Sequence, residues 1–203
     1  MFLKGFRNNQ FKSNINILGK EILEKIKLEK TPVIFVSGHF SNFELMAMEI
    51  EKSGVNLSAV YRPLNNIFLN VLMERIRKKY ICINQIKKGT SGVRELLRLY
   101  KNGYSIALMI DQRVSQGIKS KFFDEEAFTT TIPAQFIKKF NCKVVPISIE
   151  RHNDINFNIK IEKPMEFSKN SSTEKITREL NIWLEKTILK NPGQWIWSHG
   201  RWK

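Results

Sequence analysis

The 203-residue chain has little of several features that mark particular classes of protein. Its two cysteines, Cys82 and Cys142, are too few for a disulfide framework and fit a reducing compartment. With 10 glycines and 6 prolines it is neither collagen-like nor of low complexity. Its apolar runs, such as residues 106–110, are far shorter than the roughly 18 residues of a transmembrane helix. No apolar stretch follows Lys4 and Arg7, as a secretory signal would require.

What the chain has in excess is positive charge. Lysine and arginine number 34 and aspartate and glutamate 19, so the formal net charge is +15. Such a field attracts polyanions, which include nucleic acids, anionic membranes and acidic proteins. One alternative is therefore a non-catalytic module that binds nucleic acid. The chain has no zinc-finger spacing and no RNP-type aromatic block, and its basic residues are spread along its length, so we expect no nucleic-acid partner.

Strand and helix patterns alternate after a basic, poorly patterned segment at residues 1–19. Short apolar, β-branched runs predict strands at 32–38, 56–61, 104–110, 143–150 and 155–162. Amphipathic spacing predicts helices at 21–28, 42–52, 67–79, 93–100, 133–140 and 173–189, with Ser91 as the N-cap of the fourth. This alternation indicates a single α/β domain with a mostly parallel sheet flanked by helices. The turn residues 152–154 predict that the last two strands form an antiparallel pair.

Three of the predicted strands end in polar or charged residues. His39 follows the first strand, Arg62 follows the second, and Asp111 follows the third. In open α/β sheets, ligands bind beyond the carboxyl ends of the strands. The sequence therefore predicts that these three residues converge at one edge of the sheet.

The stretch from His39 to Glu44 contains the components of a general base. If His39 lies in a loop and Glu44 in the first helical turn, the carboxylate can hold the imidazole and fix its tautomer. No Gly-x-Ser-x-Gly elbow is present, so the hydroxyl that attacks is expected to come from the substrate. An alternative reading is structural, because Ser41 and Glu44 have the spacing of a capping box.

Six blocks of sequence, in order over about residues 20–203, resemble a known family. The first, Gly38-His39-Phe40-Ser41-Asn42-Phe43-Glu44, resembles the Gly-His-x-Gly-Asn-Trp-Glu signature of the lauroyl and myristoyl acyltransferases of lipid A biosynthesis. The other blocks are Tyr61-Arg62-Pro63, Asp111-Gln112, Phe122-Phe123 with the following Ala127 and Thr129, Val144-Val145-Pro146 with Arg151, and the C-terminal run from Gln194 to Lys203.

The resemblance implies a fold of the glycerolipid-acyltransferase type and a defined reaction. A fatty acyl chain would pass from acyl carrier protein to a hydroxyl of a lipid A precursor, with His39 as general base and Glu44 orienting it. A lysophospholipid or another glycolipid is the alternative acceptor. We expect no cofactor and no metal, since the three histidines are dispersed and no His-Glu-x-x-His or Cys-x-x-Cys motif is present.

Further residues are candidates for substrate binding. Arg62 could hold a substrate phosphate through paired hydrogen bonds, and Arg75 and Arg77 on the next helix could meet the same group. Asp111 could order an arginine or a loop at the site, and Asn42 belongs to the same motif as His39. The alternative for each is an ordinary surface or turn residue.

Two aromatic groups also allow two interpretations. The first could line an acyl channel or belong to the core, and it comprises Phe122, Phe123 and Phe128. The second could lie at a membrane interface or pack the C-terminus, and it comprises Trp195, Trp197 and Trp202.

The implied location is the cytoplasmic face of a bacterial inner membrane. The family carries an N-terminal membrane anchor that this sequence lacks, so we expect a peripheral form, or a fragment of a longer enzyme. Its basic surface would then hold an anionic membrane and an acidic acyl carrier protein.

Overall fold

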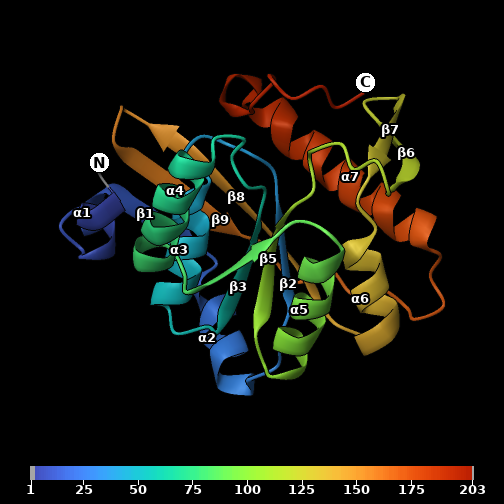
Figure 1. Cartoon of the computed structure of the whole chain (residues 1–203), viewed down its shortest axis with the longest axis horizontal. Helices are drawn as coiled ribbons and strands as arrows, with labels where there is room; N and C mark the ends of the chain where they lie inside the picture. The colour runs from blue at the N-terminus through green and yellow to red at the C-terminus, as the bar shows by residue number, and fades with distance from the viewer. Residues whose placement is uncertain (1–2, 203) are drawn as a thin grey trace.

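The structure is a computed structural model that describes residues 3–202. Its strands are β1 (Ile15–Leu18), β2 (Ile34–Ser37), β3 (Leu57–Tyr61), β4 (Asn84–Lys87), β5 (Ser105–Met109), β6 (Ile118–Phe122), β7 (Glu125–Thr129), β8 (Val144–His152) and β9 (Asn156–Ile161). Its helices are α1 (Leu3–Arg7), α2 (Lys20–Glu29), α3 (Glu44–Lys52), α4 (Ile67–Tyr80), α5 (Thr90–Lys101), α6 (Ile132–Phe140) and α7 (Thr173–Lys190) (Figure 1).

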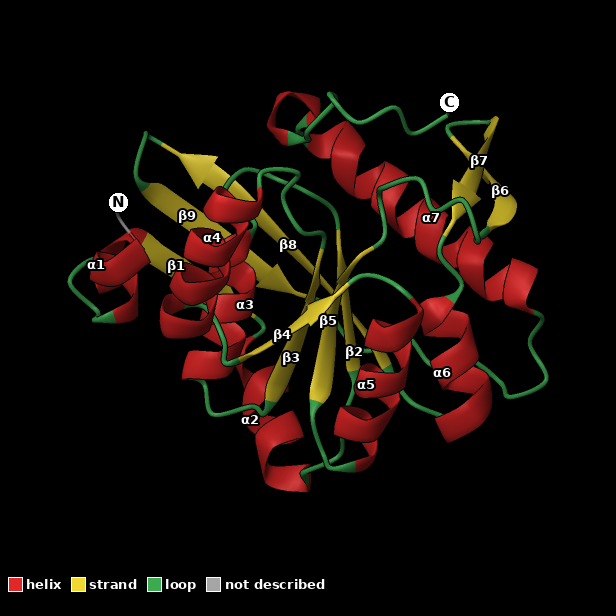
Figure 2. Ribbon diagram, viewed as in Figure 1, coloured by secondary structure: helices red, strands yellow, loops and turns green. Residues whose placement is uncertain are grey.

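Seven of the strands form one sheet in the order β1-β9-β8-β2-β5-β3-β4. Every neighbouring pair is parallel except β8 and β9, which are antiparallel as predicted. Helices α3 and α4 lie on one side of the central strands, and α5, α6 and α7 lie on the other (Figure 2). The expected α/β domain with a mostly parallel, helix-flanked sheet is therefore confirmed.

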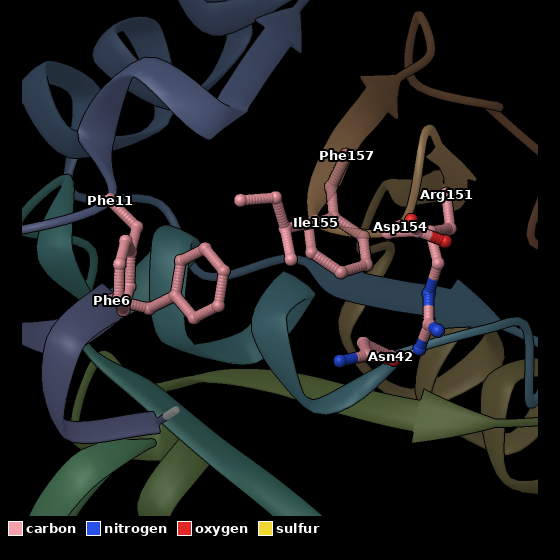
Figure 3. Close-up of a pocket in the computed structure, with 7 residues that line it drawn as sticks. All are labelled: Phe6, Phe11, Asn42, Arg151, Asp154, Ile155 and Phe157. Atoms are coloured by element: carbon pink, nitrogen blue, oxygen red, sulfur yellow. Dashed lines mark hydrogen bonds between the residues drawn. The ribbon is translucent and has the colours of Figure 1, made fainter. Parts of the chain in front are cut away.

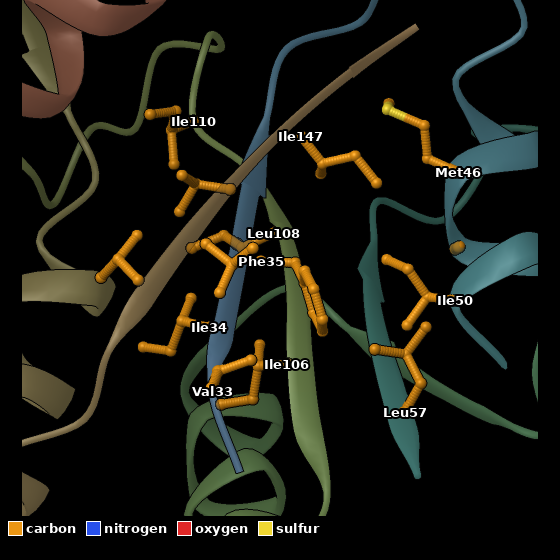
Figure 4. Packing of buried hydrophobic residues seen from close by; sticks show 14 of the residues in the cluster. Val33, Ile34, Phe35, Met46, Ile50, Leu57, Ile106, Leu108, Ile110 and Ile147 are labelled. Atoms are coloured by element: carbon orange, nitrogen blue, oxygen red, sulfur yellow. The ribbon is translucent and has the colours of Figure 1, made fainter. Parts of the chain in front are cut away.

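The core surrounds the central strands. All four residues of β2 are buried, and they include Ile34 and Phe35. Met46 and Ile50 of α3 lie over one face of this part of the sheet (Figure 4). Burying one such side chain stabilises the fold by roughly 1.5–3 kcal/mol. The central strands are therefore firmly packed, and the residues at their carboxyl ends are held in fixed positions.

Several elements differ from the sequence prediction. Residues 3–19, which belong to the segment expected to be poorly patterned, contain α1 and the edge strand β1, which pairs with β9. The edge strand β4 and the separate β6–β7 hairpin were also not predicted, because their mixed polar composition hides the strand pattern. Helix α5 begins at Thr90 after Gly89, whose φ of 138° suits glycine, so Ser91 is not its N-cap.

Within residues 3–202, no helix combines the length and the apolar character that spanning a membrane demands.

Candidate active site

The site lies where β2 and β5 end side by side. In their parallel register Ser37 is opposite Met109, and the amide of Ile110 donates to the carbonyl of Ser37 at 2.9 Å. The residues that follow, His39 after β2 and Asp111 after β5, therefore emerge at the same edge. This arrangement follows the rule for open α/β sheets.

His39 and Asp111 form a close pair. Nδ1 of His39 lies 2.7 Å from Oδ1 of Asp111, and the amide of His39 donates to Oδ2 at 2.7 Å. The indole Nε1 of Trp195 donates to the same Oδ2 at 2.9 Å. Burial alone would raise the pKa of Asp111, but the hydrogen bonds and charge of His39 and the bond from Trp195 outweigh it and leave that pKa below its usual range.

This pairing determines which nitrogen of His39 can take up a proton. Because Nδ1 faces a carboxylate, it carries the hydrogen, and Nε2 is the basic nitrogen. Nε2 lies 3.4 Å from Nε2 of Gln112, which in turn is 2.9 Å from Nε2 of His199. The ring of Phe43 packs edge-on against His39 with centroids 4.7 Å apart. An imidazole oriented by a buried carboxylate in this way is chemically able to accept a proton at Nε2.

The C-terminal segment clamps the His39 loop. The amide of Ser41 donates to the carbonyl of Gln194 at 2.8 Å, and the amide of Ile196 donates to the carbonyl of His39 at 3.1 Å. Trp195 lies between these two bonds and is buried. Trp195 belongs to the C-terminal motif block, but nothing in the sequence links it to His39, because the two are joined only by tertiary contact.

Glu44 forms no hydrogen bond or ion pair with His39, whereas the sequence analysis expected it to hold the imidazole. It is the first residue of α3, and its Oε1 accepts from Nε of Arg77 at 2.7 Å. The capping-box alternative is not formed either: Phe43 precedes the helix, and the buried hydroxyl of Ser41 has no hydrogen-bond partner. In the structure the Glu44 carboxylate is bound by the Arg77 guanidinium, and the amide of Ser41 donates to Gln194.

The predicted arginines separate in space. Arg77 pairs with Glu44 and stacks over the ring of Tyr61 at 5.5 Å, whereas Arg75 is exposed. Two residues apart on a helix, they point about 200° apart, so they cannot share one small ligand. Arg62 is exposed beside Lys88, whose pKa is lowered by burial and by the charge of Arg62. Lys88 is a basic residue near Arg62 that the sequence pattern did not single out.

An apolar cavity of about 170 Å³ adjoins the motif at Asn42 (Figure 3). Asn42 accepts a hydrogen bond from Arg151 at one end of it. The cavity is lined by Phe6, Phe11, Asn42, Arg151, Asp154, Ile155 and Phe157. Phe6 and Phe11, near the N-terminus, line it together with Phe157 of β9. This is a tertiary contact that the sequence pattern does not predict.

The structure decides between the two interpretations for only some residues of the two aromatic groups. Phe122 is completely buried against Trp195 and Trp202, with ring centroids 6.0 and 5.7 Å away, which is the packing of a core residue. Trp197 is 55% exposed, whereas Trp195 is buried.

Among residues 3–202, no group of three or more histidine, cysteine or acidic side chains is arranged to hold a metal ion.

A solved structure defines the class of fold. The chain superposes on the 1-acyl-sn-glycerophosphate acyltransferase of Thermotoga maritima with a TM-score of 0.56 and 15% sequence identity, covering 96% of this chain and 80% of the other. That likeness shows the fold of a glycerolipid acyltransferase.

The sequence comparison is more specific. A model of the bacterial lipid A biosynthesis acyltransferases matches residues 2–203, so the chain belongs to that family. It is 22% identical over 192 residues to lipid A biosynthesis acyltransferase 2 of Shigella flexneri, covering 93% of this chain and 60% of the relative. It is 26% identical over 178 residues to a lipid A biosynthesis acyltransferase of Haemophilus influenzae, covering 86% and 57%. The chain thus spans less than two thirds of these relatives.

Proposed function

We propose that this protein transfers a fatty acyl chain from acyl carrier protein to a hydroxyl of a lipid A precursor, with His39 as general base. The observation that carries the proposal is the 2.7 Å contact between Nδ1 of His39 and the buried Asp111. Family membership and the acyltransferase fold support the reaction class. A lysophospholipid or another glycolipid is the alternative acceptor.

In the proposed step, Nε2 of His39 removes the proton of the acceptor hydroxyl as its oxygen attacks the thioester carbonyl. The tetrahedral intermediate collapses with cleavage of the carbon–sulfur bond. The proton on Nε2 then passes to the departing thiolate, so the products are the acylated lipid and the free thiol. Asp111 acts as a positioning residue that holds the tautomer and stabilises the imidazolium. No cofactor or metal takes part in this scheme.

Charge and shape around the site suit the proposed substrates. The net charge of +15 favours an acidic carrier protein. Arg62 and Lys88 lie together at the ends of β3 and β4 and are suited to an acceptor phosphate. The apolar cavity beside Asn42 is suited to part of the acyl chain. We place this reaction at the cytoplasmic face of the inner membrane, with the protein bound peripherally.

The test is acyl transfer from a panel of acyl carrier protein thioesters to a tetra-acylated lipid A precursor. The parent chain and His39→Ala are assayed in parallel, with His152→Ala as the matched control because His152 is the exposed last residue of β8. Loss of the base is expected to lower turnover by about 10²-fold or more. Equal turnover by the parent and His39→Ala would refute the role of His39. Transfer only to a lysophospholipid would support the alternative acceptor.

A further inference from the structure

Helix α4 has the reverse of the usual amphipathic arrangement. The side that faces the protein carries polar residues, which are held by hydrogen bonds. Asn70 accepts from the amide of Leu64 at 2.9 Å and donates to Glu74 at 2.7 Å, and Tyr61 donates to the same glutamate at 2.5 Å. Arg77 completes this inner side through Glu44. No residue of the helix is fully buried, and these polar contacts are joined by the half-buried Met73 and Ile76 and by Tyr80, which packs against the core.

The outer side of the first two turns is apolar. Phe68 is 88% exposed and Ile67 is 76% exposed. Of the 13 large hydrophobic residues that are exposed within residues 3–202, six lie in this short stretch, namely Leu64, Ile67, Phe68, Leu69, Val71 and Leu72. Single exposed hydrophobic residues are ordinary, but a contiguous apolar patch on a soluble surface marks an interaction site.

Basic residues surround this patch. Arg75, Lys78 and Lys79 are exposed on the last turns of α4, and Arg62 lies just before the helix. The only acidic residue of α4, Glu74, points inward and binds Tyr61. The exposed side of the helix therefore combines apolar insertion residues with positive charge, which is the composition of a helix that lies in the interface of an anionic bilayer.

The patch also lies at the edge of the sheet that holds the candidate base. Helix α4 follows β3, and β3 runs parallel to β5, so the apolar turns begin at the same carboxyl edge as His39 (Figure 1). A membrane that contacts this patch would face the active-site edge. A lipid acceptor could then reach His39 without leaving the bilayer.

From these observations we infer that the outer side of α4, from Leu64 to Lys79, docks on an anionic lipid bilayer. The inference deepens the proposed function, because it specifies the surface through which a lipid acceptor is presented. Basic residues near such a surface strengthen binding through their attraction to the anionic headgroups. A second copy of this chain is the less suitable occupant, because Arg75, Lys78 and Lys79 of the two copies would repel one another.

Vesicle flotation tests the inference. The parent chain is mixed with vesicles of phosphatidylcholine alone or with 30% phosphatidylglycerol, and the bound fraction is measured at low and high salt. The test variant is Phe68→Ser combined with Leu72→Ser. The matched control is Leu28→Ser, since Leu28 is 80% exposed on α2, a helix that leads into the opposite edge of the sheet. All three chains must show the same thermal unfolding.

The parent and Leu28→Ser are expected to bind the anionic vesicles and to lose binding at high salt, whereas the double variant binds at least about tenfold more weakly. A cysteine introduced as Phe68→Cys and labelled with an environment-sensitive dye should report an apolar environment on binding, because Cys82 and Cys142 are buried and react slowly. Equal binding by all three chains would overturn the inference. So would a parent dimer that the double variant abolishes without any vesicle binding.

A second pair of measurements separates this inference from the proposed reaction. His39→Ala should bind vesicles as the parent does, since it alters the base and not the docking surface. The double variant should keep its turnover on an acceptor dispersed in detergent and lose it on the same acceptor in vesicles. Vesicle binding without turnover by the parent would refute the reaction and leave the docking surface supported.

Discussion

Replacing Asp111 with asparagine tests which of two carboxylates, that of Asp111 or that of Glu44, orients His39. In the structure Asp111 accepts from Nδ1 and the amide of His39 and from Trp195, whereas Glu44 binds Arg77. Asparagine is nearly isosteric, but it carries no charge and offers an NH₂ group in place of one oxygen. If that group faces Nδ1, the histidine hydrogen moves to Nε2, which then cannot accept the substrate proton.

The expected magnitude follows from these contacts. A hydrogen bond to a charged group contributes about 1.5–3 kcal/mol, and loss of the imidazolium partner adds to this. Together with the wrong tautomer, kcat/KM should fall by about 10²- to 10⁴-fold, which corresponds to roughly 3–5 kcal/mol of transition-state stabilisation. Glu44→Gln keeps an oxygen that can accept from Arg77 and leaves the contact between His39 and Asp111 in place, so its effect should stay below about tenfold.

The assay is kcat/KM for acyl transfer as a function of pH, with Asp111→Asn, Glu44→Gln and His39→Ala compared at matched thermal stability. Asp111→Asn should lose activity nearly as completely as His39→Ala. If Glu44→Gln abolished transfer while Asp111→Asn kept a tenth or more of it, the assignment made from the geometry would be refuted. Glu44 would then be the partner of His39 during turnover, as the family resemblance implies.

Two further predictions concern the support of the site and the acid stability of the fold. Trp195→Phe removes the 2.9 Å bond to Asp111 and keeps most of the ring, so kcat/KM should fall about tenfold, and unchanged activity would show that this bond does not position the acid. The hydrogen bond from Tyr61 is the main cause that lowers the pKa of Glu74 from 4.5 to about 2. The stabilisation that the Glu74 carboxylate provides is therefore present above about pH 4.5 and is lost as the pH falls toward 2. In urea unfolding, the free energy of unfolding of Glu74→Gln should fall less steeply between pH 5 and 3 than that of the parent. Identical slopes for the two chains would contradict this.

The sequence alone determined the central sheet and the edge at which the site lies. The β-branched runs of β2 and β5 can be buried only as interior strands, and parallel strands bring their carboxyl ends together. The positions of His39, Arg62 and Asp111 after three strands therefore predicted the functional edge without any tertiary information. The edge strands β1 and β4 were missed because one-sided, partly polar strands carry no such signal.

Only the tertiary structure decided how the side chains pair. His39 and Asp111 are 72 residues apart, and their contact depends on the register of β2 against β5, which periodicity does not encode. Glu44 is nearer to His39 in the sequence and is also a carboxylate, but in the structure it binds Arg77 instead. Likewise, the pattern of α4 showed an amphipathic helix but not which side faces outward. The hydrogen bonds of Asn70, Glu74 and Arg77 turn its polar side inward, and that orientation leaves the apolar side exposed.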